Sequence, residues 1–150
     1  MKRSYLVSAI VPLVLICGFG DHLNGQNGSN NTLEPKQGLA ICFLRAINTA
    51  ESSYHENRGA YAPWDTLMTT KEFTEFGLPA AARGYPELAK AHFSSGLEVL
   101  PGWSLRLDLV ADGKGYDVLL QDNTDKTCGY AALTDERGVI RQSKAIDCKI

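Results

Sequence analysis

The sequence has no excess of basic residues, and this absence limits its expected partners. Lysine and arginine together number 15 against 17 aspartates and glutamates, so the formal net charge is -2. Nucleic-acid binding depends on clustered lysine and arginine, and anionic membrane surfaces attract polybasic segments. The chain has no such cluster, so we expect neither a nucleic-acid partner nor a membrane-surface partner.

Residues suited to catalysis or metal binding are also sparse. The three histidines, His22, His55 and His92, show no H-x-x-x-H spacing, and the sequence contains no C-x-x-C pair. The glycine-rich phosphate loops and the G-x-S-x-G nucleophile motif are missing as well. Cys42 falls on the apolar side of an expected helix, where a buried thiol is unreactive. We therefore expect no enzyme, no cofactor and no catalytic residue.

The first twenty residues are typical of a signal peptide. A basic start, MKR, precedes the uncharged apolar run Leu6–Phe19, and the small residues Gly18 and Gly20 suit a cleavage point. The apolar run is shorter than the roughly 20 residues that span a bilayer. Removal of residues 1–20 would change the formal charge from -2 to -4, because two basic residues leave. An uncleaved N-terminal anchor is the alternative.

Residues 33–150 are expected to form one domain behind a flexible linker at 21–32, which is rich in asparagine and glycine. Apolar residues recur at helical spacing from Leu39 to Tyr54, which predicts an amphipathic helix from about residue 33 to residue 57. Phe43 falls on its apolar face and should pack against a sheet. Glu51 falls on the expected exposed side, so Glu51→Ala should change stability little.

From Trp103 the apolar period changes to two, which indicates strands. Four are expected, at 103–109, 116–120, 128–134 and 139–142, with short helical turns at 65–68, 71–76 and 86–93 before them. The order of a helix followed by a run of strands indicates an α+β fold. We therefore predict a long N-terminal helix packed on a four-stranded antiparallel meander sheet.

Several segments in this order resemble the globular domain of type IV pilins and type II secretion pseudopilins. They are RAINTAESSY at 45–54, GAYA at 59–62, GWSL at 102–105 and TDERGVIR at 134–141. The resemblance implies a pilin-like fold in an exported, non-enzymatic structural or interaction protein, an accessory to a type IV pilus or a type II secretion system. Residues 4–20 lack the glutamate of the pilin assembly helix, so the resemblance implies the fold more than filament membership.

Periplasmic or secreted localisation is expected in either of two functional interpretations. The first is the pilin-like accessory, whose partners would be pilus or secretion-system proteins. The alternative is a small binding or inhibitory module that acts on an unknown partner. Ordered self-association would favour the first and capture of a soluble ligand by a monomer the second, so the oligomeric state is left open.

Export would expose the cysteines to oxidising conditions, where disulfides form. Cys17 would leave with the signal peptide, and Cys42, Cys128 and Cys148 would remain. The pilin resemblance implies a C-terminal disulfide, and a turn at residues 135–138 would bring the end of the chain back toward Cys128. We predict a Cys128–Cys148 bridge, with Cys42 as a buried thiol.

Two weaker site candidates complete the interpretation. Asp122, Asn123 and Asp125 offer oxygen ligands that suit calcium, and some pseudopilins hold calcium in their C-terminal loops. A polar turn between strands is the favoured interpretation, so no metal is expected. Trp64 is a candidate surface contact, with packing against the helix as the alternative.

Overall fold

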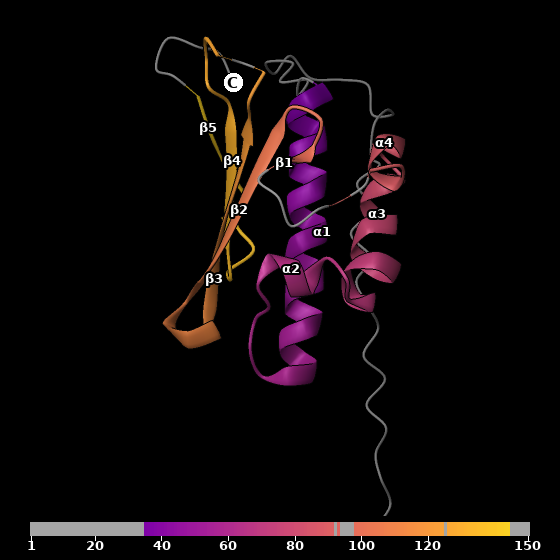
Figure 1. Ribbon diagram of the computed structural model, residues 1–150, viewed down its shortest axis with the longest axis vertical. Helices are drawn as coiled ribbons and strands as arrows, with labels where there is room; N and C mark the ends of the chain where they lie inside the picture. Colours follow the sequence, from indigo (N-terminus) through magenta and orange to yellow (C-terminus); the bar gives the residue numbers. More distant parts are fainter. Residues whose placement is uncertain (1–34, 92, 94–97, 125, 145–150) are drawn as a thin grey trace, which may run out of the picture.

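The first described element is the helix α1, Pro35–Arg58, in a computed structural model that describes residues 35–91, 93, 98–124 and 126–144 (Figure 1). Gly59 ends the helix in the left-handed region, with φ of 76°, and its N–H donates to the His55 carbonyl at 2.7 Å. The predicted helix is confirmed, with its end one residue beyond the prediction. The predicted signal peptide and linker lie outside the described residues.

The second half of the chain forms one antiparallel sheet. Its strands are β1 (Glu98–Leu100), β2 (Trp103–Val110), β3 (Gly115–Asp122), β4 (Ala131–Asp135) and β5 (Arg141–Ser143). They pair in chain order, each antiparallel to the next, so the sheet is a meander. The predicted α+β class, with a helix followed by an antiparallel sheet, is confirmed.

Two finer expectations are corrected. The sheet has five strands and not four, because Glu98–Leu100 pairs with the start of β2 as an additional edge strand. Three residues are too few to show an alternating pattern in the sequence. The helix is also not a long one: α1 ends at Arg58 after 24 residues, about 36 Å at 1.5 Å per residue.

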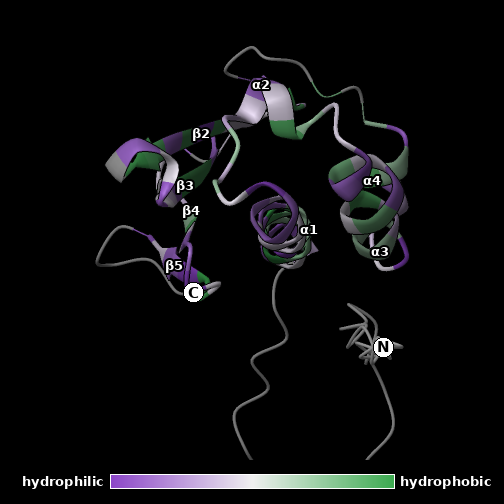
Figure 2. Cartoon of the chain, turned by 90° about the horizontal axis from the view of Figure 1, so that it is seen from below, coloured by the Kyte–Doolittle hydropathy of each residue, from purple (hydrophilic) through white to green (hydrophobic). Residues whose placement is uncertain are grey.

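α1 lies between the sheet and the helices α3 (Leu78–Ala82) and α4 (Pro86–Ala89), and α2 (Trp64–Leu67) lies on a third side of it (Figure 2). The π-helix η1 (Glu72–Gly77) leads directly into α3. Because α1 has neighbours on more than one side, it buries more positions than a single apolar stripe would supply. The predicted turns at 65–68, 71–76 and 86–93 correspond to α2, η1 and α4, whereas α3 was not expected.

Phe43 of α1 is fully buried, as predicted, but among the short helices. Its ring centroid lies 6.2 Å from that of Trp64, 6.3 Å from that of Phe73 and 5.2 Å from that of Phe93. Edge-to-face and stacked rings at these separations are the favourable arrangements. The expectation that this face packs on the sheet is therefore corrected: the aromatic cluster joins α1 to α2 and η1.

Gly77 links η1 to α3 without a break, although a glycine there suggests a helix end in the sequence. A Cβ atom at Gly77 would lie 2.6 Å from the carbonyl oxygen of Ala46 in α1. The position therefore requires glycine because two backbones meet, and not because the helix stops. A glycine at a helix end and a glycine at a close contact have the same appearance in a sequence.

Candidate functional site

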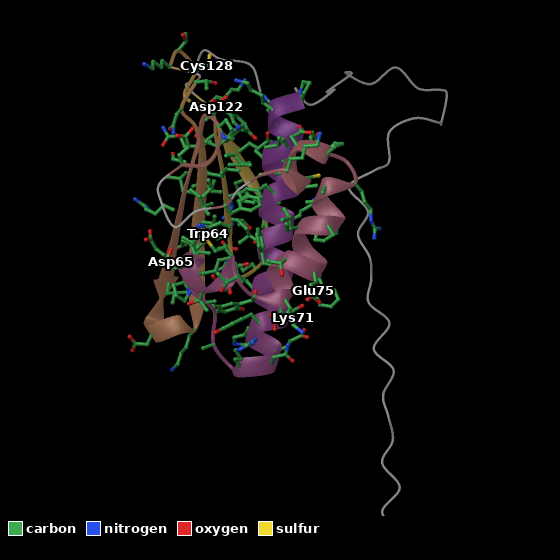
Figure 3. All side chains as sticks on the ribbon, turned by 45° about the vertical axis from the view of Figure 1, so that its right-hand side comes forward. Trp64, Asp65, Lys71, Glu75, Asp122 and Cys128 are labelled. Carbon is green, nitrogen blue, oxygen red and sulfur yellow. The ribbon has the colours of Figure 1, made fainter. Side chains whose placement is uncertain are left out.

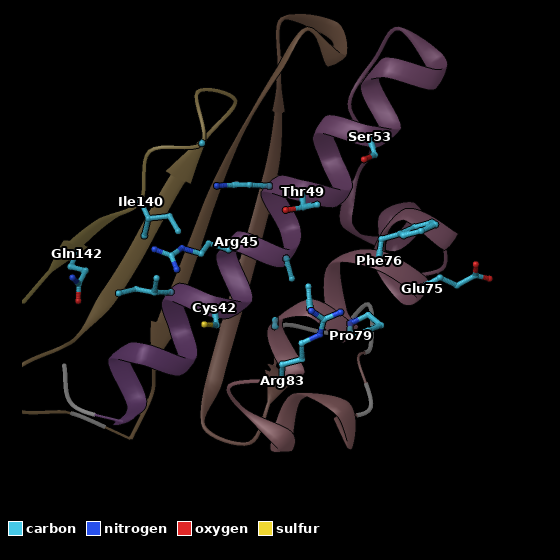
Figure 4. Close-up of a pocket in the computed structure, with 16 residues that line it drawn as sticks. Cys42, Arg45, Thr49, Ser53, Glu75, Phe76, Pro79, Arg83, Ile140 and Gln142 are labelled. Atoms are coloured by element: carbon cyan, nitrogen blue, oxygen red, sulfur yellow. The ribbon is translucent and has the colours of Figure 1, made fainter. Parts of the chain in front are cut away.

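A groove of about 830 Å³ runs along α1 (Figure 4). We call it the α1 groove. Residues of α1 form its floor, η1 and α3 form one wall, and the segment that leads from the β4–β5 turn into β5 forms the other. The lining residues are Ile41, Cys42, Arg45, Ala46, Asn48, Thr49, Ser53, Glu75, Phe76, Pro79, Ala80, Ala81, Arg83, Gly138, Ile140 and Gln142.

Two large apolar side chains beside the groove are exposed. Phe76 lines the η1 wall and is 63% exposed, and Val139, next to the lining residue Ile140 on the other wall, is 50% exposed. The two side chains lie on opposite sides of the floor of α1, so each side of the groove presents an apolar side chain to solvent.

The π-helix η1 separates the environments of two nearby phenylalanines. Phe73 is fully buried in the aromatic cluster, whereas Phe76, three residues later, stands at the groove. In a π-helix, whose turn is wider, the side chains of two residues three positions apart point in more different directions than they do in an α-helix. Thr70 supports the start of η1, because its hydroxyl oxygen accepts the Phe73 N–H at 3.3 Å. Single π-turns are rare in proteins, and those that do occur are often found at functional sites.

Three charged side chains, Arg45, Arg83 and Glu75, line the groove. Arg45 extends from the floor and Arg83 from the end of α3, and both side chains point into the groove, whereas the carboxylate of Glu75 points away from it (Figure 4). Arg45 and Arg83 are exposed. The groove thus combines an apolar lining with guanidinium groups from two different elements.

The floor of the groove is held on the sheet by Asn48. Its Oδ1 accepts a hydrogen bond from the Tyr116 hydroxyl of β3 at 2.9 Å, and its Nδ2 donates to the Thr134 hydroxyl of β4 at 2.9 Å. Tyr116 and Thr134 are both 2% exposed. Because these partly buried bonds join three elements, they help to fix the position of α1 relative to two strands.

Glu51 is a buried carboxyl group, so the expectation that it lies on the exposed side of the helix is wrong. It is 0% exposed, its Oε2 accepts the Ala62 N–H at 2.9 Å, and its Oε1 has no hydrogen-bond partner. Burial raises the pKa of Glu51 to about 7, against the opposing effect of the Ala62 hydrogen bond.

A raised carboxyl pKa is a common sign of a catalytic acid or base. Such a group must also come within hydrogen-bond reach of a reacting atom. Glu51 does not line the groove and has no exposed surface. Burial of the Glu51 carboxyl group explains its raised pKa, and the same burial leaves no surface for a substrate to reach.

The calcium candidates are only partly described, and the described ones have other partners. Asp122 lies at the end of β3, on the same side of the molecule as Cys128 (Figure 3). Asp122 is 4% exposed and accepts hydrogen bonds from the N–H and hydroxyl of Thr124 at 2.8 and 2.6 Å and from Lys36 at 3.2 Å. Burial raises its pKa, but these hydrogen bonds outweigh burial and hold the pKa below its usual value. The Oδ1 of Asn123 accepts from the Ser104 hydroxyl at 3.2 Å.

Asp125 lies outside the described residues. Within the described ranges, no group of three or more His, Cys, Asp or Glu side chains is positioned to hold a metal ion. The ammonium group of Lys36 is the cation that Asp122 contacts.

Trp64 is 8% exposed and packs edge-to-face on Phe43 and Phe73. Packing against the helix, the alternative to a surface contact, is therefore the observed role. His55 stacks on Tyr61 with ring centroids 4.4 Å apart, near the end of α1. The other two histidines lie outside the described residues.

Cys42 is a buried thiol, 4% exposed, as expected. Cys128 is disulfide-bonded, and Cys148 lies outside the described residues. The pairing of these two cysteines therefore stays a prediction.

Sequence reasoning did not identify the residues of the α1 groove. Phe76 and Arg83 come from η1 and the end of α3, whereas Ile140 lies next to β5, and only the packing of both walls against α1 brings them together. Phe76 had no local signal of its own. Residues three apart lie on the same face of an α-helix, so the sequence would assign Phe73 and Phe76 to one face.

In the part of the chain that is described, no helix combines the length and apolar character needed to cross a bilayer. No protein-family model, curated protein or solved structure matches this chain.

Proposed function

We propose that this chain is an exported, non-enzymatic interaction protein with a pilin-like domain that binds a protein partner in the α1 groove. The α+β order of one helix followed by an antiparallel meander supports the pilin-like part of the proposal. The basic and apolar pattern of residues 1–20 supports export. A type IV pilus or type II secretion system is the proposed setting.

The observation that carries the proposal is Phe76, 63% exposed on a π-helix that forms the wall of a groove. Exposing a phenylalanine to water forfeits roughly 1.5–3 kcal/mol of burial free energy. A partner that covers Phe76 would recover that free energy on binding. Aromatic side chains in the centre of an interface are the usual anchors of protein–protein binding.

Non-enzymatic function is supported by the surroundings of the chemically unusual groups. Glu51 has a raised pKa but no exposed surface, and the Cys42 thiol is 4% exposed on an apolar helix face. Buried thiols of this kind are unreactive. The α1 groove itself is lined by apolar, arginine, hydroxyl and amide side chains, and the carboxylate of its one lining acid, Glu75, points away from it (Figure 4).

Site-specific photo-crosslinking in the source cells tests the proposal. A photoreactive phenylalanine analogue would replace Phe76 in one variant and Leu109 in a control, because Leu109 is also apolar and exposed, at 39%, but does not line the groove. We expect one dominant adduct, identified by mass spectrometry, from position 76 and none from position 109. Equal adducts from both positions, or none, would refute an interaction in the groove.

The identity of the adduct separates the two forms of interaction protein. A pilus or secretion component would support the accessory role, whereas an unrelated soluble protein would support the separate binding or inhibitory module. Amino-terminal sequencing of the exported protein checks the other part of the proposal, and it should begin near Asp21. An intact Met1 on a cytoplasmic protein would contradict export.

A further inference from the structure

One wall of the α1 groove is an edge of the sheet (Figure 1). β5 pairs with β4 through Arg141, Gln142 and Ser143, and no described strand pairs with the other side of β5. An edge strand presents main-chain N–H and C=O groups that have no partner within the sheet. Ile140 and Gln142 line the groove, so these main-chain groups lie beside it.

The side chains of β5 alternate between the groove and the outer face of the sheet. Gln142 lines the groove, whereas the preceding residue, Arg141, is exposed and donates from Nη1 to Oδ2 of Asp135 at 3.2 Å. A strand added beside β5 would follow the same alternation, because successive side chains of a strand point to opposite faces of the sheet. Every second side chain of the added strand would therefore face the groove.

Contacts within the domain already hold β5 in place. The Tyr130 hydroxyl, which is buried, donates to Oε1 of Gln142 at 3.0 Å, and Asp135 accepts the hydrogen bond from Arg141. An ordered binding edge lowers the entropy that association costs. An incoming segment would therefore pair with a strand that is already formed.

The opposite edge of the sheet is built differently. The register of β1 shifts between Glu98 and Leu100, Pro101 follows the strand, and Oε1 of Glu98 accepts the Gly102 N–H at 2.7 Å. Bulges and prolines are devices that protect an edge from further pairing. β5 has neither of them, so the edge that adjoins the groove is the better template for another strand.

The groove is long enough for a short strand. Its floor runs from Ile41 to Ser53 along α1, about 18 Å at 1.5 Å per residue. An extended segment rises about 3.4 Å per residue, so about five residues span that length. Roughly half of their side chains would face the groove, where Phe76 and Pro79 on the far wall and Ile140 on the near wall provide apolar surface.

We propose, resting on the function proposed above, that the α1 groove binds an extended segment of a partner protein, which pairs with the edge of β5 as a sixth strand and directs alternate apolar side chains into the groove. In this mode of recognition, main-chain hydrogen bonds supply affinity and alternate side chains supply specificity. A bound helix would satisfy its own main-chain groups and leave those of β5 to water. A second copy of this chain is the less suited occupant, because the only residue of its β5 on the groove side is Gln142, a polar amide.

Peptides with N-methyl groups test the main-chain pairing. The probe is a rhodamine-labelled peptide of eight residues that alternates valine with serine, and two variants carry N-methyl groups either on the valines or on the serines. Successive N–H groups of a strand point to opposite edges, so only one of the two patterns removes the hydrogen bonds to β5. By fluorescence anisotropy, that variant should bind the purified protein about tenfold less tightly than the other, because it loses about two hydrogen bonds.

Amide hydrogen exchange, followed by NMR, locates the pairing in the purified protein. A saturating amount of the unmethylated peptide should slow exchange about tenfold or more at one or two amides of β5. The amides of β1, the other edge of the same sheet, are the matched control and should not change. Phe76→Ala should weaken binding of the peptide about tenfold, and Leu109→Ala, an apolar change outside the groove, should not.

The outcomes separate this proposal from the general one. Equal affinities of the two methylated peptides, no binding of the unmethylated peptide at about 1 mM, or equal protection of β1 and β5 would overturn the strand pairing. A dominant crosslinked adduct at position 76 alongside such a result would leave the interaction function standing with a partner of another shape. An adduct that joins two copies of this chain would also overturn the partner segment, and absence of both signals would overturn both proposals.

Discussion

Glu51 should make the stability of this protein fall as pH rises through the neutral range. Its carboxyl group titrates near 4.5 in an exposed state and near 7 when buried in the folded chain. The folded state therefore binds the proton more tightly than the unfolded state. The resulting contribution to the free energy of unfolding is complete below pH 4.5 and is lost as pH rises through 7.

The size of the effect follows from the difference between the two pKa values. One pKa unit corresponds to about 1.36 kcal/mol, so a rise from 4.5 to about 7 corresponds to about 3 kcal/mol. That amount is a large part of the 5–15 kcal/mol that typically stabilises a domain. The structural cause is the burial of the carboxyl group, which raises its pKa. The hydrogen bond from Ala62 to Oε2 offsets this only in part, and Oε1 has no hydrogen-bond partner.

Urea denaturation of the wild type and of Glu51→Gln between pH 4 and pH 8 measures this contribution. Glutamine keeps an oxygen that can accept the Ala62 N–H but has no charge to titrate. The wild-type free energy of unfolding minus that of the variant should therefore decrease by about 3 kcal/mol across this range. Subtraction removes the contributions of the other titrating groups.

A matched control for the substitution itself is Glu56→Gln, which makes the same chemical change at an exposed position of the same helix. If the wild type and Glu51→Gln ran parallel from pH 4 to pH 8, the reasoning from burial would be wrong. Glu51→Ala should now be destabilising, because it leaves the Ala62 N–H without its acceptor.

Two substitutions probe the packing, and one mapping experiment probes the covalent structure. Phe43→Ala should lower the free energy of unfolding by about 3–5 kcal/mol, the usual cost of truncating a core aromatic; a loss below 1 kcal/mol in chemical denaturation would contradict its place in the aromatic cluster. Gly77→Ala should cost about 1–3 kcal/mol because its Cβ meets the Ala46 carbonyl oxygen, and a thermal melt at the wild-type temperature would refute that contact. Non-reducing peptide mapping should yield a Cys128–Cys148 peptide, whose bridge closes a loop that stabilises the fold by roughly 3 kcal/mol, and any bridge to the third thiol would overturn the pairing.

Local sequence patterns were sufficient to predict the elements that depend on neighbouring residues in the chain. The helical spacing of apolar residues in α1 and the glycine after it determine both its presence and its end. The turn between β2 and β3 places Asp112 and Gly113 in the left-handed region, with φ of 56° and 84°. Asp and Gly tolerate that region and are the usual residues of tight hairpin turns. β2 and β3 accordingly pair along their full length on either side of this turn.

The predictions that were wrong or missing concern features that depend on distant parts of the chain. Glu51 was assigned to the exposed side because a single apolar stripe predicts one covered face, whereas α1 is covered on two sides and by the segment that contains Ala62. β1 is too short to show a period and exists because β2 offers it an edge. The α1 groove depends on the relative placement of α3 and the β4–β5 turn, which no window of sequence contains.

The backbone contact between Gly77 and Ala46 fixes the position of one wall of the groove without involving the side chains on its surface. Peptide groups set the position of the wall, while Phe76, Pro79 and Arg83 supply its chemistry from side chains that face solvent. Substitutions at these three positions should therefore alter the choice of partner with little effect on folding. The domain would therefore serve as a scaffold for variant libraries, in which these three surface positions are varied while the backbone stays the same.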